Sequence, residues 1–265
     1  MFSKVGKYEF MAEPFHCDFT GRLLMGRLGN HLINAADFHS NDRGFGMLYL
    51  NSIHKTWVLS RLAIEMEEMP KAYDHFHVET WVESAMRFFT NRNFRIKGSS
   101  ATVQEDEKVY GYGRSIWAMI DTETRQPADL LSINDGTLTN YVVGIDGGEE
   151  YIECPIAKPS RVKITDDAQL VRRMKTVYSD IDMNGHVNSI KHIEHILDLW
   201  DADWYARFQL KRLDIAYVAE AHLGDELLFY QEEKEKGNYS VRVMREEAFG
   251  ETPVEICRCQ VVFRM

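Results

Sequence analysis

Hydrophobic positions along the chain recur first at helical spacing and then at strand spacing. The helical stripe carries apolar residues three and four positions apart: Leu28, Leu32, Ala35 and Ala36. The pattern then alternates over 77–82 and continues over 94–96 and 109–120, where Gly111 and Gly113 suit a bulge. The first half is therefore expected to form one helix followed by an antiparallel meander.

The second half repeats this order. Apolar residues recur at helical spacing before a second set of strand patterns: Val187, Ile190, Ile193, Ile196, Leu197 and Trp200. Strand patterns follow at 213–219, 226–230, 239–244 and 255–263, and the charged run 232–236 reads as a hairpin tip. A helix and a meander, twice in one chain, predict a tandem α+β fold.

Turn-forming residues separate the two halves. They gather between positions 125 and 160: Pro127, Gly136, Gly144, Gly147, Gly148, Pro155 and Pro159. We therefore expect an N-terminal domain over 1–135, a linker over 136–160 and a C-terminal domain over 161–265.

Composition and charge exclude several classes of protein. The chain has 45% hydrophobic and 27% charged residues, which is typical of a soluble globular protein. Its net charge of −10 argues against a nucleic-acid partner. Basic residues crowd 161–175, where a solvated face is expected. No stretch approaches 18 apolar residues, so no membrane span is expected.

The cysteines and the N-terminal residues indicate a cytoplasmic protein. The four cysteines fit neither a zinc pattern nor a disulfide framework: Cys17, Cys154, Cys257 and Cys259. Residues 1–15 carry early acids and no apolar run, unlike a signal or transit peptide. This favours a bacterial source.

The densest polar motif, DIDMNGHVN at 180–188, lies directly before the second expected helix. Turn-forming residues there are typical of ordinary helix capping. Asp182, Asn184 and His186 stand at alternate positions, however, and in an extended segment such residues share one side. The helix start would add backbone N–H groups suited to a developing oxyanion. Spacing alone leaves capping and catalysis open.

The segment DIDMNGHVNSIKHIEHILD at 180–198 resembles the plant-type acyl-acyl-carrier-protein thioesterases, whose second hot-dog domain carries a D-x-N-x-H-V-N motif. The resemblance implies catalytic roles for Asp182, Asn184 and His186. A further family acid lies 34 residues beyond the histidine, and LDIAYVAE at 213–220 places it at Glu220.

The resemblance extends close to the full length of the chain. Residues 30–32, 57–61 and 74–83 look like the family's N-terminal domain. It implies a tandem double hot-dog fold, each half a long helix wrapped by a curved antiparallel sheet. The first domain would supply the acyl-chain pocket, and His31 and Asn34 there are expected to be structural.

Thioester hydrolysis requires delivery of water to the carbonyl and stabilisation of the oxyanion. We expect Asp182 and Glu220 to form the acid–base pair, with Glu220 polarising the water. Asn184 would orient the water or the carbonyl oxygen, and His186 would hold a carboxylate and protonate the thiolate. In the rival mechanism Asp182 is a nucleophile. Plant members often have a cysteine after the acid, but this chain has Ala221, so no thiolate nucleophile is expected.

The predicted function is hydrolysis of fatty acyl-acyl-carrier-protein thioesters, without metal or cofactor. The partner would be acyl carrier protein carrying the acyl chain, and a homodimer is possible. Two alternatives stay open, an acyl-CoA thioesterase and a non-catalytic hot-dog protein that binds acyl groups. A repressor of the latter kind would need a DNA-binding appendage, which residues 1–20 do not resemble.

Other histidines are expected to lie in solvent. His192 and His195 are three positions apart on the second helix, with Glu194 between them and no evident third metal ligand. His75 and His77 alternate on an expected strand and are expected to be exposed as well.

Overall fold

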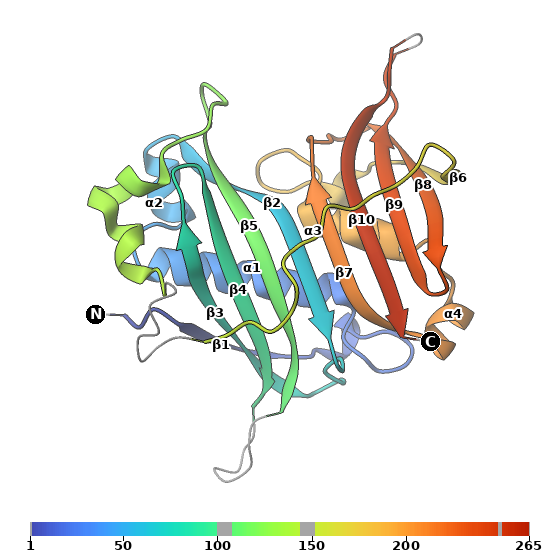
Figure 1. Ribbon diagram of the computed structural model, residues 1–265, viewed down its shortest axis with the longest axis horizontal. Helices are drawn as coiled ribbons and strands as arrows, with labels where there is room; N and C mark the ends of the chain where they lie inside the picture. Colours follow the sequence, from blue (N-terminus) through green and yellow to red (C-terminus); the bar gives the residue numbers. More distant parts are fainter. Residues whose placement is uncertain (1, 100–107, 144–151, 249–250, 265) are drawn as a thin grey trace. The chain divides into compact units, whose positions relative to one another are not determined.

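The computed structural model of the protein describes residues 2–99, 108–143, 152–248 and 251–264 (Figure 1). Contacts divide the chain into two compact units. The N-terminal unit comprises Met1–Ser60 and Ile64–Lys158, and the C-terminal unit comprises Arg61–Ala63 and Pro159–Met265. The domain limits expected from the sequence stay a prediction, and residues 144–151 of the expected linker lie outside the described residues.

The N-terminal unit combines one long helix with an antiparallel sheet of strand order β1-β3-β4-β5-β2, in which Arg61–Ala63 of β2 count with the C-terminal unit. Its elements are β1 (Gly6–Met11), η1 (Pro14–His16), α1 (Met25–Asp42), α2 (Met47–Ser52), β2 (Lys55–Met66), β3 (His75–Ala85), β4 (Phe89–Gly98), β5 (Val109–Asp121) and η2 (Leu130–Tyr141).

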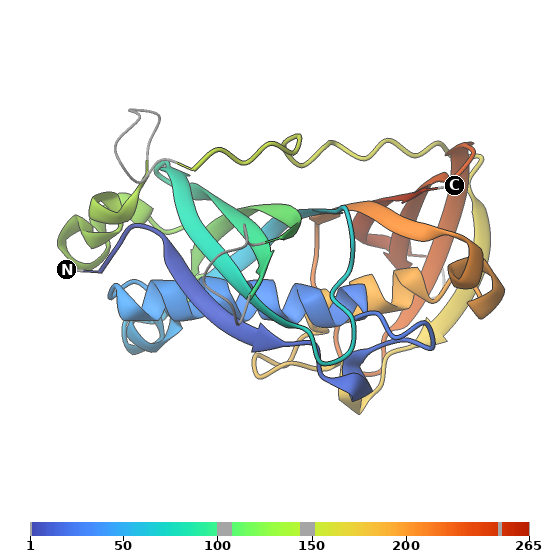
Figure 2. The same ribbon diagram turned by 90° about the horizontal axis from the view of Figure 1, so that it is seen from below.

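The helix α1 lies along one face of this sheet (Figure 2). The apolar stripe expected from the sequence is its buried side: Leu28, Leu32, Ala35 and Ala36. Burying such a stripe against a sheet removes apolar area from water and so stabilises the unit.

The opposite face of the sheet is covered locally by residues 152–156. Trp81 of β3 is only 1% exposed and packs with Cys154 and Ile156. Arg114 of β5 donates a hydrogen bond of 2.6 Å to the Cys154 carbonyl, which holds this segment in place. Trp81 is therefore buried although it points away from the α1 side.

A bulge curves the sheet where the sequence suggested one. Ile96 pairs with Gly111 and Lys97 with Val109, so Tyr110 is the extra residue of β5. A Cβ atom at Gly111 would lie 2.4 Å from the Glu65 carbonyl of β2. Only glycine fits this close approach of two strands.

The C-terminal unit repeats the topology. Its strand order is β6-β8-β9-β10-β7, which corresponds strand for strand to the order in the N-terminal unit. Its elements are β6 (Gln169–Lys175), η3 (Tyr178–Asp180), α3 (Ser189–Leu197), α4 (Ala202–Arg207), β7 (Gln209–Tyr217), β8 (Glu226–Glu235), β9 (Asn238–Arg245) and β10 (Val254–Arg264). Ile190, Ile193 and Ile196 form the buried face of α3.

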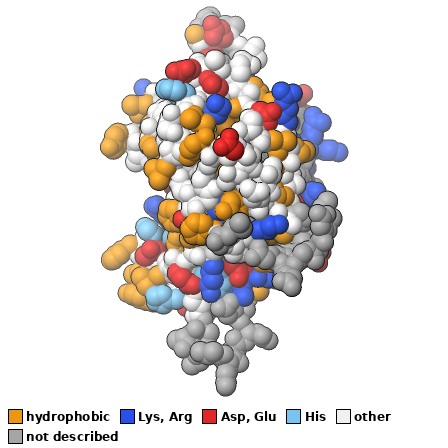
Figure 3. All heavy atoms as spheres, turned by 90° about the vertical axis from the view of Figure 1, so that its left-hand side faces the viewer, with side chains coloured by type: hydrophobic (Ala, Val, Ile, Leu, Met, Phe, Trp, Pro, Cys, Tyr) orange, Lys and Arg blue, Asp and Glu red, His pale blue; other side chains and the backbone are white. Residues whose placement is uncertain are grey.

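Several elements were not expected from the sequence. The edge strands β1 and β6 precede the helix of each unit, and β6 has mostly exposed residues, so it shows no apolar alternation. Residues of η2 pack into the N-terminal unit, since Leu138 is fully buried beside Phe45. Figure 3 views the end of this unit where α2 and η2 lie, and hydrophobic side chains mix there with charged ones. Over the described ranges, no helix has the length and apolar character needed to cross a membrane.

Candidate active site

The motif DIDMNGHVN folds as a tight loop between η3 and α3. Ile181 and Val187 form an isolated antiparallel bridge, and Gly185 has a φ of +83°. The carboxylate of Asp182 accepts hydrogen bonds from the backbone N–H groups of Asn184 at 2.8 Å and His186 at 3.3 Å. The expectation of an extended segment with three side chains on one side is therefore wrong. A carboxylate that bonds to backbone N–H groups two and four residues on closes a turn.

The C-terminal end of this loop is anchored to neighbouring elements. Asn188 caps α3 by accepting a hydrogen bond of 2.8 Å from the Ile190 N–H. The Val187 N–H donates to the Ala221 carbonyl at 2.7 Å. The Tyr217 hydroxyl at the end of β7 donates to the Ser189 carbonyl at 2.7 Å. These bonds tie the start of α3 to the segment that follows β7.

This anchoring brings His186 and Glu220 together. The Nε2 atom of His186 lies 3.4 Å from Oε2 of Glu220, with side chains 27% and 38% exposed. Arg245 donates a hydrogen bond of 3.0 Å to the Glu220 carbonyl and so fixes its backbone. An imidazole facing a carboxylate in a partly solvated place is an arrangement that can activate water and move a proton.

The other two expected site residues lie differently. Asp182 contacts His186 through the backbone N–H, as described above. Asn184 is exposed at the tip of the loop, next to Met183, whose side chain is 81% exposed. Of the four expected residues, the structure therefore brings the side chains of His186 and Glu220 together. The other two lie in the same loop as His186.

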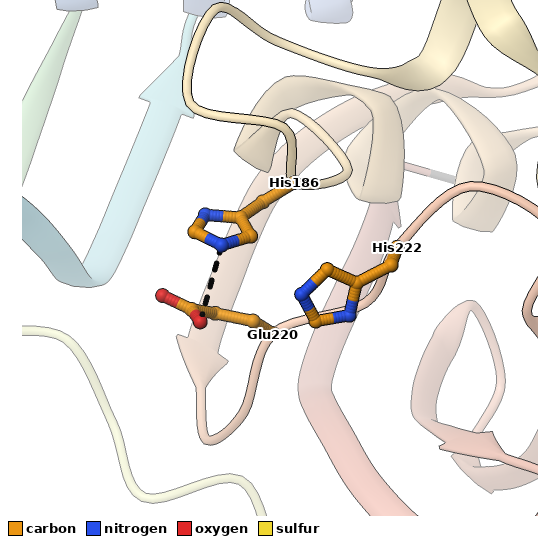
Figure 4. A group of neighbouring side chains, drawn as sticks. All are labelled: His186, Glu220 and His222. Carbon is orange, nitrogen blue, oxygen red and sulfur yellow. Dashed lines mark ion pairs between the residues drawn. The ribbon is translucent and has the colours of Figure 1, made fainter.

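His222 is a neighbour that the sequence reading missed. Its ring centroid lies 5.1 Å from that of His186, and the two rings meet edge to face. Figure 4 shows the His186 ring above the Glu220 carboxylate and the His222 ring beside the Glu220 side chain. The spacing Glu220-x-His222 was a usable signal, because alternate residues of an extended segment share a side.

Asp180, the first residue of the motif, is buried and pairs with His195 of α3. The Nε2 atom of His195 is 2.9 Å from Oδ1 of Asp180, which is 2% exposed. The second carboxylate oxygen of Asp180 accepts from the Val177 N–H at 2.9 Å. His192 is 3% exposed, and burial lowers its pKa to about 4. The expectation that His192 and His195 face solvent is wrong, since α3 turns this side toward η3.

Two histidines of the N-terminal unit also test the sequence reading. His77 is fully buried, with its Nε2 atom 3.6 Å from Oε1 of Glu79, so the expectation that it is exposed is wrong. His75 is exposed. His31 packs against Phe10 with ring centroids 4.5 Å apart, and burial lowers its pKa. This fits the structural role expected for His31.

The N-terminal unit contains a pocket with a mostly apolar lining. Residues of α1, α2, β2, β3, β4, β5 and η2, with Phe45 between the two helices, line a volume of about 70 Å³: Ile33, Ala36, Asp37, Ser40, Phe45, Met47, Trp57, Val82, Thr90, Arg92, Trp117 and Leu138. Arg92 is 4% exposed and donates to the Ser40 hydroxyl at 2.9 Å. Burial lowers the pKa of Arg92 to about 9, so its guanidinium stays charged near neutral pH.

Known proteins match this chain in both sequence and fold. The family described as "Acyl-ACP thioesterase N-terminal domain" matches residues 4–135, and "Acyl-ACP thioesterase C-terminal domain" matches residues 164–259. The crystal structure of an acyl-ACP thioesterase from Bacteroides thetaiotaomicron is 48% identical, covers 98% of each chain and superposes with a TM-score of 0.86. The structure of the 12:0-ACP thioesterase from Umbellularia californica covers 100% of this chain and 98% of its own at 16% identity, with a TM-score of 0.81.

Plant relatives are longer than this chain. The oleoyl-acyl carrier protein thioesterase 2 of Arabidopsis thaliana is 25% identical over 230 residues, which are 83% of this chain and 60% of the relative. The match to the Coriandrum sativum oleoyl-acyl carrier protein thioesterase covers 47% of that protein. This chain thus spans about half the length of such relatives.

The fold and its structural neighbours define an α+β protein built from two hot-dog units, which confirms the fold expected from the sequence. The chain belongs to the acyl-ACP thioesterase family.

Proposed function

We propose that this protein hydrolyses fatty acyl-acyl-carrier-protein thioesters to free fatty acid and carrier protein. One observation carries the proposal: His186 Nε2 and Glu220 Oε2 lie 3.4 Å apart, at the positions where the family motif implies catalytic residues. The 48% identical bacterial acyl-ACP thioesterase structure supports the choice of substrate class.

Glu220 is the general base in this proposal. Its carboxylate takes a proton from water as the water oxygen attacks the thioester carbonyl, and His186 holds the carboxylate in place. The C–S bond then breaks and the thiolate leaves. A thiolate needs little help to leave near neutral pH, because thiols have a pKa of about 8.5.

Asp182 acts as a positioning residue, since its oxygen holds the backbone N–H of His186. Asn184 stands exposed on the same loop and orients the water or the carbonyl oxygen. In this proposal water attacks the carbonyl, and Asp182 serves the loop, since its Oδ1 atom accepts two backbone hydrogen bonds.

The pocket of the N-terminal unit receives the acyl chain. Its lining is mostly apolar, and Ile33 and Ala36 of α1 contribute to it. The buried Arg92 and the half-buried Asp37 are also among its lining residues. A buried charge rejects methylene groups, so these residues limit the space open to a chain.

We place the protein in the cytoplasm. Its proposed partner is acyl carrier protein that carries an acyl chain. Within the part of the chain that the structure describes, all four cysteines are free, which fits a reducing compartment. A homodimer is the other association expected from the sequence, and sedimentation of the purified chain tests it.

Release of product from a panel of acyl-carrier-protein and acyl-CoA thioesters of different chain length tests the function. We expect higher kcat/KM for carrier-protein substrates. Preference for the CoA thioesters would assign the acyl-CoA alternative, and no hydrolysis of any substrate would assign a binding function.

A further inference from the structure

Three potential metal ligands meet at the candidate active site. The ligand atoms of His186, Glu220 and His222 all lie within 4.8 Å of one another. They come from two segments, the loop before α3 and the segment after β7, which the Val187 N–H bond to Ala221 holds together. We propose that these three residues bind a divalent transition-metal ion, preferably Zn²⁺, and that the bound ion inhibits thioester hydrolysis.

The spacing of His186 and Glu220 suits a metal ion. Zinc binds histidine nitrogen and carboxylate oxygen at about 2.0–2.2 Å. Two such ligands on neighbouring corners of a tetrahedron are separated by about 3.3–3.5 Å. The observed distance between Nε2 of His186 and Oε2 of Glu220 is 3.4 Å. The ion can therefore enter between these atoms with little movement of either side chain.

His222 has the exposure and orientation needed for a third ligand. Its Nδ1 atom faces the Asp225 carboxylate at 3.9 Å, which leaves Nε2 for the ion. A carboxylate behind the second ring nitrogen is the usual partner of a zinc-bound histidine. Figure 4 shows one nitrogen of this ring turned toward the other two residues. The ring is exposed, so a rotation of the side chain closes the remaining distance.

The ligand chemistry selects the kind of ion. Two imidazoles and one carboxylate favour zinc and its neighbours over magnesium or calcium, which prefer oxygen. A water molecule completes the tetrahedron. The ion would occupy the very atoms that activate water in the proposed mechanism, so it competes with catalysis. The inhibitory part of this inference rests on the proposed function, whereas the binding part does not.

Binding is tested without substrate. Zn²⁺ is titrated into the chelator-treated full chain in a calorimeter, and the native protein is expected to bind one ion. His222→Asn should lower the affinity by at least about tenfold, since loss of an outer-shell partner alone costs about 10–100-fold. The matched control is His54→Asn, which removes an exposed imidazole near Glu123 in the N-terminal unit. Unchanged affinity in His222→Asn, or no binding by the native protein, would overturn the site.

Inhibition is tested by measuring the release of free fatty acid. Release of thiol is not a suitable signal, because zinc binds the thiol product. Native activity should fall in step with occupancy and return when EDTA is added. His222→Asn should need at least about tenfold more Zn²⁺ for the same inhibition. Full activity at saturating Zn²⁺, or acceleration by Zn²⁺, would overturn the inhibitory role. A native protein that binds the ion but hydrolyses no thioester would keep the metal site and reject the proposed function.

Discussion

The carboxylate of Asp182 accepts a hydrogen bond from the backbone N–H of His186 at 3.3 Å, so the acid of the motif contacts the histidine's backbone and shapes the loop. Asn keeps an oxygen that can accept this bond, whereas Ala does not. We therefore expect Asp182→Asn to retain kcat/KM within about tenfold, and Asp182→Ala to lose about 10²-fold or more. Steady-state hydrolysis of an acyl-carrier-protein substrate measures both.

If Asp182 were the nucleophile, these two substitutions would have a different effect on kcat/KM. Both substitutions would then abolish turnover to a similar extent, because neither Asn nor Ala can form an acyl anhydride. That outcome would reject the positioning role and favour the rival mechanism.

The contact between His195 of α3 and the buried Asp180 should stabilise the loop that begins at Asp180. Replacing His195 with Leu removes the partner of Oδ1 of the buried Asp180 carboxylate and leaves the Val177 N–H bond to Oδ2, so the free energy of unfolding should fall by about 3 kcal/mol. Chemical denaturation measures this loss. Lys191→Ala on the same helix is the control, since its partly exposed ion pair with Glu194 contributes about 0–1 kcal/mol. Equal losses in both variants would contradict the account.

The regular elements could be predicted because their patterns are local. The stripe at Leu28 and Leu32 and the alternation around Val78 arise within single elements, and the structure buries these residues as expected. The pairing of His186 with Glu220 could be expected only through the family resemblance, because the two residues lie 34 positions apart in separate segments, the loop before α3 and the segment after β7. Burial of His192 depends on how α3 turns against η3 and β7, which helical spacing does not show.

Edge strands and single contacts were harder to predict. The strand β6 pairs through its backbone while its side chains stay largely exposed, so its hydrophobic pattern is weak. The spacing of His222 from Glu220 was a local signal, but the contact of His222 with His186 depends on the segment after β7 lying beside the loop before α3.

The buried His192 should make stability depend on pH. Its pKa is lowered to about 4, by burial first and by the neighbouring His195 second, while Asp180 acts in the opposite direction. The unfolded chain therefore takes up this proton at higher pH than the folded chain, and stability present above the unfolded pKa is lost as pH falls. Between about pH 7 and about pH 5 we expect His192 to account for a loss of about 2 kcal/mol.

Denaturation curves across this range, for the native chain and for His192→Leu, measure that loss. The variant should show a smaller dependence on pH. Other groups, such as His39 with its pKa lowered to about 2 by burial, contribute equally to both proteins. Identical dependence in the two chains would contradict the assignment.

The pocket of the N-terminal unit should set the preferred chain length. Ala36 lines the pocket, whereas the adjacent Ala35 is buried outside its lining. Ala36→Leu should lower kcat/KM for the longest accepted chain by about 10–200-fold relative to shorter chains, the cost of a methylene that no longer fits. Both substitutions overpack the core, so each should lower the free energy of unfolding by about 1–3 kcal/mol. A shift in chain length with Ala35→Leu, and none with Ala36→Leu, would reject the pocket.

The most direct test of the central claim is hydrolysis of an acyl-carrier-protein thioester by the native chain and by Glu220→Gln. Gln keeps the size of the side chain and removes the base, so kcat should fall by about 10²–10⁴-fold with an unchanged free energy of unfolding. Glu226→Gln, at an exposed acid at the start of β8, is the matched control and should hydrolyse like the native chain. Activity of Glu220→Gln within about threefold of native would contradict the role of Glu220 as the base.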